Sequence, residues 1–177
     1  QMDAAMLDIN HFRMVNERFG KAYGDKILIR LGDKLGELAH EAGGIACRRE
    51  ADTFMIYVPH QDDYSPFLEN LSASLLDEEV AESRVRMRMG VYPDVDKNID
   101  MELRFDRAKM AADTVKDTLN RNIGFYDEKL HEKQLFAEQL IDGFSTAIAE
   151  KQFQVYYQPK FDVRPDTPLL ASAEALV

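Results

Sequence analysis

The sequence is short of cysteine. Among its 177 residues Cys47 is the only one. A disulfide within the chain needs two cysteines, and a cysteine-rich zinc site needs more, so both are excluded. No apolar run reaches the ~18 residues of a membrane-spanning helix, and no secretory signal pattern opens the chain. These absences predict a cytoplasmic fragment without a membrane partner. Because both ends look cut, we expect a longer parent protein, which could carry a membrane anchor of its own.

Positive charge is also scarce. The chain has 22 lysines and arginines against 32 aspartates and glutamates, which gives a net charge of -10. Such a chain repels a nucleic-acid backbone and an anionic membrane, so neither is an expected partner. Hydrophobic residues make up 45% of the sequence, which is enough for a packed core and excludes the disordered class.

The spacing of apolar residues predicts an α+β fold for the first two thirds of the chain. Short apolar runs predict strands at 4–9, 45–49, 54–58, 85–91 and 123–126. Helical spacing predicts helices at 11–19, 25–42, 64–76 and 101–115. We expect Asp25 to cap the second helix and Gly43-Gly44 to end it. This order is typical of helices packed on a mostly antiparallel sheet.

The pattern changes after residue 127. Apolar residues recur every three or four positions from 128 to 151, which predicts one long amphipathic helix. Segments 152–163 and 169–177 are strand-like, and a turn rich in proline and aspartate separates them.

The opening segment carries a first resemblance. Residues 7–13 read Leu-Asp-Ile-Asn-His-Phe-Arg, and Asn16, Gly20, Gly24 and Asp25 follow. This pattern, together with Phe125-Tyr126-Asp127, resembles a GGDEF domain, the domain of diguanylate cyclases. The resemblance implies a nucleotidyl-cyclase-like antiparallel sheet flanked by helices over residues 1–127, with the family's N-terminal helix missing.

The resemblance also implies two groups of site residues. The positions that recognise guanine match Asn16 and Asp25, although Asp25 could equally serve as a helix cap. The metal-binding positions match Asp8 and Asp52, which makes magnesium an optional ion beside a GTP phosphate. An inherited acidic pair that holds no metal is the alternative.

Several positions depart from the family pattern. The signature pentapeptide reads Glu50, Ala51, Asp52, Thr53, Phe54, so both glycines and the acid at the fourth position are replaced. The lysine and arginine that should meet the phosphates align with Asp113 and Asp117, although a shift in alignment would bring Lys109 or Lys116 closer. The product-inhibition motif aligns with Glu41 and Gly44 and is absent. We expect no cyclase activity and no required cofactor, and we interpret the four histidines as surface residues.

A second resemblance lies at the carboxyl end. Residues 153–160 (FQVYYQPK) and 174–177 (EALV) resemble the start of an EAL domain, a barrel that hydrolyses cyclic di-GMP with divalent metal. The resemblance implies that Glu174 is a metal ligand and that Gln158 lies near the substrate in an intact barrel. Residues 152–177 would then be its truncated first strands, and 128–151 a linker helix.

Together these features predict an inactive GGDEF module of a bacterial cyclic di-GMP signalling protein. It would control a downstream EAL phosphodiesterase in the same chain, and that phosphodiesterase would be the active part of the parent. Two alternatives stay open, a GTP-sensing domain without turnover and a weak magnesium-dependent cyclase. A homodimer is also open.

Overall fold

The structure is a computed structural model that describes residues 1–75, 85–118 and 120–177. Its internal contacts divide the chain into two compact units, Gln1–His131 and Glu132–Val177.

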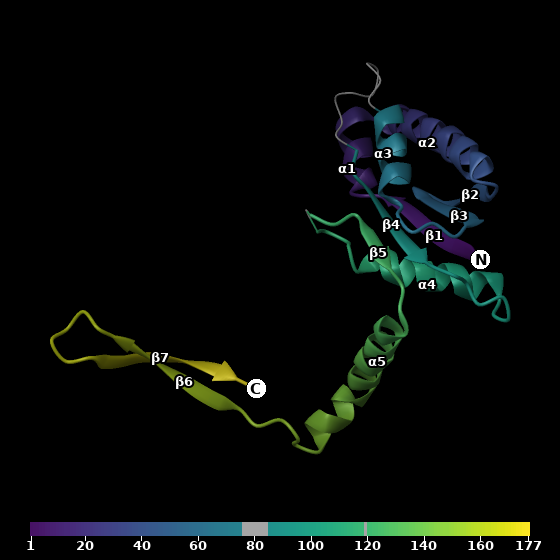
Figure 1. Ribbon diagram of the computed structural model, residues 1–177. Coiled ribbons are helices and arrows are strands. Elements are labelled where there is room, and N and C mark those ends of the chain that lie inside the picture. The colour runs from purple at the N-terminus through teal and green to yellow at the C-terminus, as the bar shows by residue number, and fades with distance from the viewer. Residues whose placement is uncertain (76–84, 119) are drawn as a thin grey trace. The chain divides into compact units, whose positions relative to one another are not determined.

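The first unit is built on a five-stranded sheet (Figure 1). Its strands are β1 (Met2–Ile9), β2 (Ile45–Glu50), β3 (Thr53–Pro59), β4 (Met87–Tyr92) and β5 (Ile123–Phe125). The spatial order is β2-β3-β1-β4-β5, and every pair except the last is antiparallel. The parallel pairing of β4 with β5 departs from the expected antiparallel sheet, because a helix joins the two strands as a crossover.

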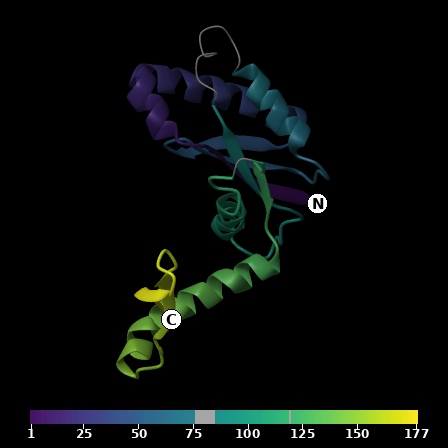
Figure 2. The same ribbon diagram turned by 90° about the vertical axis from the view of Figure 1, so that its left-hand side faces the viewer.

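Helices cover both faces of this sheet. On one face lie α1 (Phe12–Phe19), α2 (Lys21–Glu41) and α3 (Ser65–Ser74), and on the other lies α4 (Met101–Asp113), as Figure 2 shows. Since side chains alternate along a strand, β1 supplies both cores. Ala5, Leu7 and Ile9 pack beneath α2 and α3, whereas Ala4 and Met6 pack beneath α4.

A glycine allows α4 to lie close to the sheet. A Cβ added to Gly90 of β4 would come within 2.0 Å of the Ala108 carbonyl oxygen and 2.2 Å of the Ala112 nitrogen. Gly124 of β5 meets the same helix, 2.1 Å from the Ala111 carbonyl oxygen. These close approaches fix α4 against the edge of the sheet where β4 and β5 run side by side.

The helix boundaries correct one expectation. Asp25 is not a helix cap, because α2 already begins at Lys21, directly after Gly20 with φ 88°. At the other end of α2 the prediction is confirmed, since Gly43 with φ 79° follows the last turn. The helix expected at 64–76 is α3, Ser65–Ser74, and Leu76 lies outside the described residues.

The second unit contains most of α5 (Glu128–Ala149) and the strands β6 (Tyr156–Asp162) and β7 (Leu169–Leu176). The two strands form an antiparallel pair in which Tyr156 faces Leu176. The amphipathic helix and both strands expected from the sequence are therefore present. Within the described part of the chain, every helix is too short or too polar to cross a membrane.

Candidate functional site

Three charged side chains meet at the carboxyl end of β1. In the antiparallel register Asp8 lies opposite Thr53 of β3 and opposite Arg88 of β4. Opposite residues project from the same face of a sheet, so Arg88 Nη2 donates a hydrogen bond to Asp8 Oδ2. Asp52 joins them from the turn between β2 and β3, where its carboxyl group is hydrogen-bonded to that of Asp8.

The charges of this cluster are largely balanced internally. Burial raises the pKa of Asp52 to about 6, and the hydrogen bond with Asp8 and its negative charge add to the rise, while Arg88 opposes it. A hydrogen bond between two carboxyl groups needs a proton on one of them. The Arg88 and Asp8 side chains are 13% and 21% exposed, so water screens their attraction weakly.

This donor set fits a magnesium ion poorly. Magnesium takes oxygen ligands in near-octahedral geometry, usually from carboxylates and a phosphate. Here the Asp8 carboxylate is already paired with Arg88, and Asp52 shares a hydrogen bond with it. Among residues 1–75, 85–118 and 120–177 no three metal-ligating side chains gather into a cluster. The guanidinium of Arg88 supplies the positive charge that a metal would otherwise bring.

The five signature positions form the hairpin that joins β2 to β3. Ala51 has φ 45°, in the left-handed region that favours glycine. Its carbonyl oxygen accepts a 2.8 Å hydrogen bond from Arg48 Nε. Phe54 is buried in the core, whereas Glu50 is exposed. The hairpin therefore keeps a left-handed backbone conformation that glycine favours, although the residue there is an alanine.

The two positions predicted to recognise guanine lie on neighbouring helices. Asn16 is on α1 and Asp25 is on α2. A Cβ added to Gly24 would come within 1.9 Å of Asn16 Oδ1, so the asparagine lies against the residue that precedes Asp25. Asn16 Oδ1 is buried and lacks a hydrogen-bond partner among the described residues. The structure thus brings the two positions together, and their role in binding stays a prediction.

The two aspartates that replace basic residues have different surroundings. Asp117 has φ 58°, and its Oδ1 lies 3.6 Å from Nε2 of His11, the residue before α1. Asp113 is the exposed last residue of α4. Backbone N–H groups at the start of a helix favour anions, so a carboxylate beside the start of α1 opposes a phosphate there.

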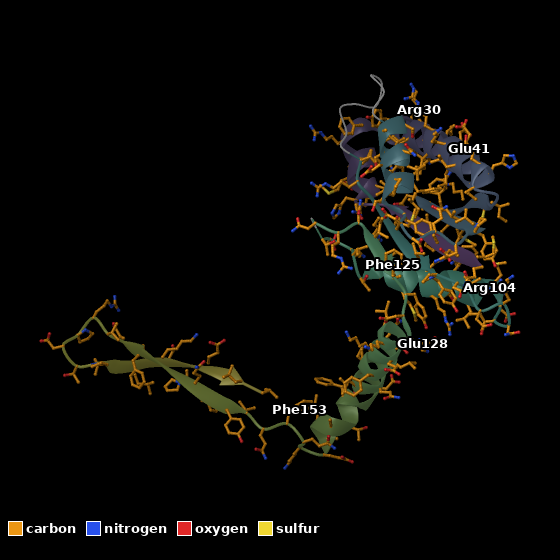
Figure 3. The ribbon with its side chains drawn as sticks, viewed as in Figure 1. Arg30, Glu41, Arg104, Phe125, Glu128 and Phe153 are labelled. Atoms are coloured by element: carbon orange, nitrogen blue, oxygen red, sulfur yellow. The ribbon has the colours of Figure 1, made fainter. Side chains whose placement is uncertain are left out.

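The positions of the absent inhibition motif serve the fold. Glu41 is the exposed end of α2, labelled in Figure 3. A Cβ added to Gly44 would lie 2.3 Å from the Tyr57 carbonyl oxygen, so a side chain there would displace β3.

In the second unit, the two positions assigned by the EAL resemblance face each other. Gln158 of β6 is directly opposite Glu174 of β7, and both are exposed. Glu174 Oε2 forms a 2.8 Å ion pair with Lys160 Nζ.

Sequence reasoning missed two groups. Arg88 lies in the strand predicted at 85–91 and carries no predicted role, although its place opposite Asp8 follows once β1 and β4 are paired. His60 is exposed, as expected of the histidines, but its Nδ1 lies 2.9 Å from the fully buried Asp3 carboxylate, a contact that the sequence did not indicate. Their separation of 57 residues leaves no local pattern to detect.

Comparisons with known proteins agree with the first resemblance. The family model described as "Diguanylate cyclase, GGDEF domain" matches residues 1–122. An uncharacterised protein of Synechocystis is 26% identical over 97% of this chain, and the chain spans only 25% of that protein.

Solved structures show the same fold. The active GGEEF domain of a diguanylate cyclase from Vibrio cholerae has a TM-score of 0.58 and 20% identity, and the alignment covers 71% of this chain and 83% of that one. An EAL/GGDEF domain protein from M. capsulatus has a TM-score of 0.59 and 19% identity, with 71% and 84% covered. At these identities the likeness concerns the fold alone.

Proposed function

The chain belongs to the GGDEF domain family of diguanylate cyclases, and on this premise we propose that residues 1–127 form a catalytically inactive regulatory domain of a cyclic di-GMP signalling protein. The ion pair between Arg88 and Asp8 carries the proposal. A cyclase must hold a metal ion and the triphosphate of GTP beside the nucleophile. An arginine paired with the first carboxylate competes directly with that metal.

Two further features support inactivity. Thr53 stands at the signature position where the family carries an acid, and a hydroxyl cannot act as a carboxylate base. Asp117 places negative charge beside the start of α1, where a phosphate would otherwise be attracted. Since two unit charges at ~4 Å interact by about 1 to 4 kcal/mol in wet surroundings, a carboxylate at that distance from a phosphate charge opposes triphosphate binding by a similar amount.

A variant tests the role of Arg88 directly. The unmodified chain, incubated with GTP and magnesium, should yield no cyclic di-GMP by chromatography. Arg88→Ser should raise magnesium affinity, measured by calorimetry, and should still give no product because Thr53 is unchanged. Arg18→Ser, which alters an exposed arginine of α1, is the matched control and should leave magnesium affinity unchanged. Cyclic di-GMP formed by the unmodified chain would refute the proposal and favour a weak magnesium-dependent cyclase.

We further propose that this domain controls a downstream EAL phosphodiesterase through α5. The motifs at 153–160 and 174–177 support this. Apolar side chains on α5 are exposed, namely Phe136, Leu140, Ile141, Phe144 and Ile148. An apolar stripe of this kind is typical of a surface that another domain or another chain covers.

A longer protein that continues past Val177 tests this second step. Leu140→Asp combined with Phe144→Asp should change its rate of cyclic di-GMP hydrolysis, because the stripe would no longer pack. Glu138→Gln, an exposed polar change on the same helix, should leave the rate unchanged. A longer protein that does not hydrolyse cyclic di-GMP would refute the phosphodiesterase assignment.

One observation favours a second candidate, a GTP-sensing domain without turnover. The buried Oδ1 of Asn16 has no partner among the described residues, although buried acceptors are usually paired. A guanine N–H would satisfy it, with Asp25 nearby. If binding comes from the base alone, calorimetry should show GMP binding no more weakly than GTP, and Asn16→Ala should abolish it. Tight and selective GTP binding would favour the GTP sensor over the regulatory domain proposed first.

A further inference from the structure

A polar cavity of about 360 Å³ lies at the end of the sheet where β1 ends and β4 begins. Its lining includes no residue of the signature hairpin. Its walls come from the residue after β1, the start of β4, the end of α3 and the loop between α4 and β5. Two backbone hydrogen bonds hold these walls together, from Asn10 N to the Arg86 carbonyl and from Met89 N to the Asn122 carbonyl, both 2.8 Å. The cavity is therefore a feature of the fold itself.

The lining is cationic in a strongly acidic chain. Arg86 and Arg121 both line the cavity, and among the described lining residues none is an aspartate or a glutamate. Neither arginine side chain forms an ion pair within the part of the chain that the structure describes. In a chain of net charge -10, two arginines at one cavity that have no carboxylate partner among the described residues indicate an anionic ligand.

Amide groups complete the lining. Asn10, Asn120 and Asn122 all contribute to the cavity, and each amide can both donate and accept hydrogen bonds. Asn10 Oδ1 is buried and has no hydrogen-bond partner among the described residues. Such an acceptor needs a donor, which a hydroxyl or amino group of a ligand would supply. A volume of about 360 Å³ is in the range of small-molecule sites.

We propose that this cavity binds a small organic phosphate monoester. Arg86 and Arg121 hold the phosphate. Its charge of roughly -1.5 to -2 near neutral pH balances two guanidinium groups, whereas a ligand with a single carboxylate would balance only one. A hydroxyl-bearing body donates a hydrogen bond to Asn10. The lining does not include Asp8, Asp52, Asn16 or Asp25, so this proposal stands independently of the proposed regulatory function.

Ribose 5-phosphate is a suitable probe, titrated into the 177-residue chain at constant ionic strength. We expect saturable shifts of the backbone amide signals of Arg86 and Asn122 in NMR spectra. Arg86→Gln combined with Arg121→Gln should lower the affinity at least about tenfold, because charge-assisted hydrogen bonds to the phosphate are lost. Arg18→Gln, an exposed change outside the cavity, should bind as the unmodified chain does.

Two further ligands separate the sources of binding. Ribose alone should bind far more weakly, and equal binding would overturn the role assigned to the arginines. Inorganic phosphate should also bind more weakly than the ester, and equal affinity would overturn an organic ligand. Unsaturable shifts in the unmodified chain, or shifts confined to residues outside the cavity, would overturn the proposal even if the double variant fails to fold.

Discussion

Two aspartates of the same strand have opposite surroundings. Asp3, near the start of β1, is fully buried, and four groups are hydrogen-bonded to its carboxylate. They are the Tyr64 hydroxyl at 2.7 Å, His60 Nδ1 at 2.9 Å and the backbone N–H groups of Asp94 at 2.7 Å and Gln61 at 3.3 Å. Asp8, near the other end, has one arginine and faces a second carboxyl group.

The comparison distinguishes the structural carboxylate of Asp3 from the carboxylate of Asp8, which lies in the candidate site. Donors from the loops after β3 and β4 surround Asp3, so its charge is compensated and it ties these loops to the first strand. Asp8 lies at an end of the sheet where two carboxyl groups share one guanidinium. A carboxyl group whose pKa is raised by burial and by a neighbouring carboxyl group marks a candidate functional site.

The largest expected effect on stability comes from the buried carboxylate of Asp3. Asp3→Ala leaves the buried Tyr64 hydroxyl and two part-buried backbone N–H groups without their acceptor. We expect the free energy of unfolding to fall by about 3–5 kcal/mol, measured by urea denaturation. Asp100→Asn, at an exposed position before α4 whose side chain makes no capping bond, should change it by less than about 0.5 kcal/mol. Similar losses in both variants would contradict the comparison.

The same contrast explains what the sequence could predict. Periodicity located β1, α2 and α4, because each buries one continuous stripe or strand, and it located α5 from an apolar stripe that is exposed. The Asp8 end was found through its resemblance to a family motif, which is local in sequence. The Asp3 end was missed because its partners lie 57 to 91 residues away and belong to loops. Long-range pairing of polar groups leaves no period in the sequence.

A smaller loss of unfolding free energy is expected for the cluster of Asp8, Arg88 and Asp52. Arg88→Ala leaves the Asp8 and Asp52 carboxyl groups together without their cation, so we expect a loss of about 1–3 kcal/mol near neutral pH. Adding Asp8→Asn should recover part of it, because only one ionisable group then remains. A double-mutant cycle by urea denaturation measures this coupling. If the two changes are simply additive, the cluster is not energetically coupled.

The signature hairpin should gain stability from a glycine. Ala51 has φ 45°, a conformation that costs a residue with a Cβ more than it costs glycine. Ala51→Gly should therefore raise the free energy of unfolding by about 0.5–1 kcal/mol, with no gain in cyclase activity. Ala73→Gly on α3, where glycine weakens a helix, is the opposite control and should lower it. A loss at both positions would show that the turn is not strained.

The smallest effect is a difference in pH dependence between the two ends of β1. The hydrogen bond and negative charge of Asp3 raise the pKa of His60 above its ordinary value. The protonated histidine therefore stabilises the fold fully below about pH 6.5, and this contribution is lost as the pH rises through the raised pKa.

Asp52 changes the stability of the fold in a lower pH range. Its pKa is raised to about 6, so the stability it contributes when protonated is present below about pH 4 and lost as the pH rises through about 6. Urea denaturation at steps from about pH 4 to about pH 9 should thus show two successive losses in the unmodified chain. His60→Gln should remove only the upper one and Asp52→Asn only the lower one, whereas His40→Gln, at an exposed position of α2, should keep both. If the loss of stability at the higher pH persists in His60→Gln, another group causes it. The protonated His60 then does not stabilise the contact with Asp3.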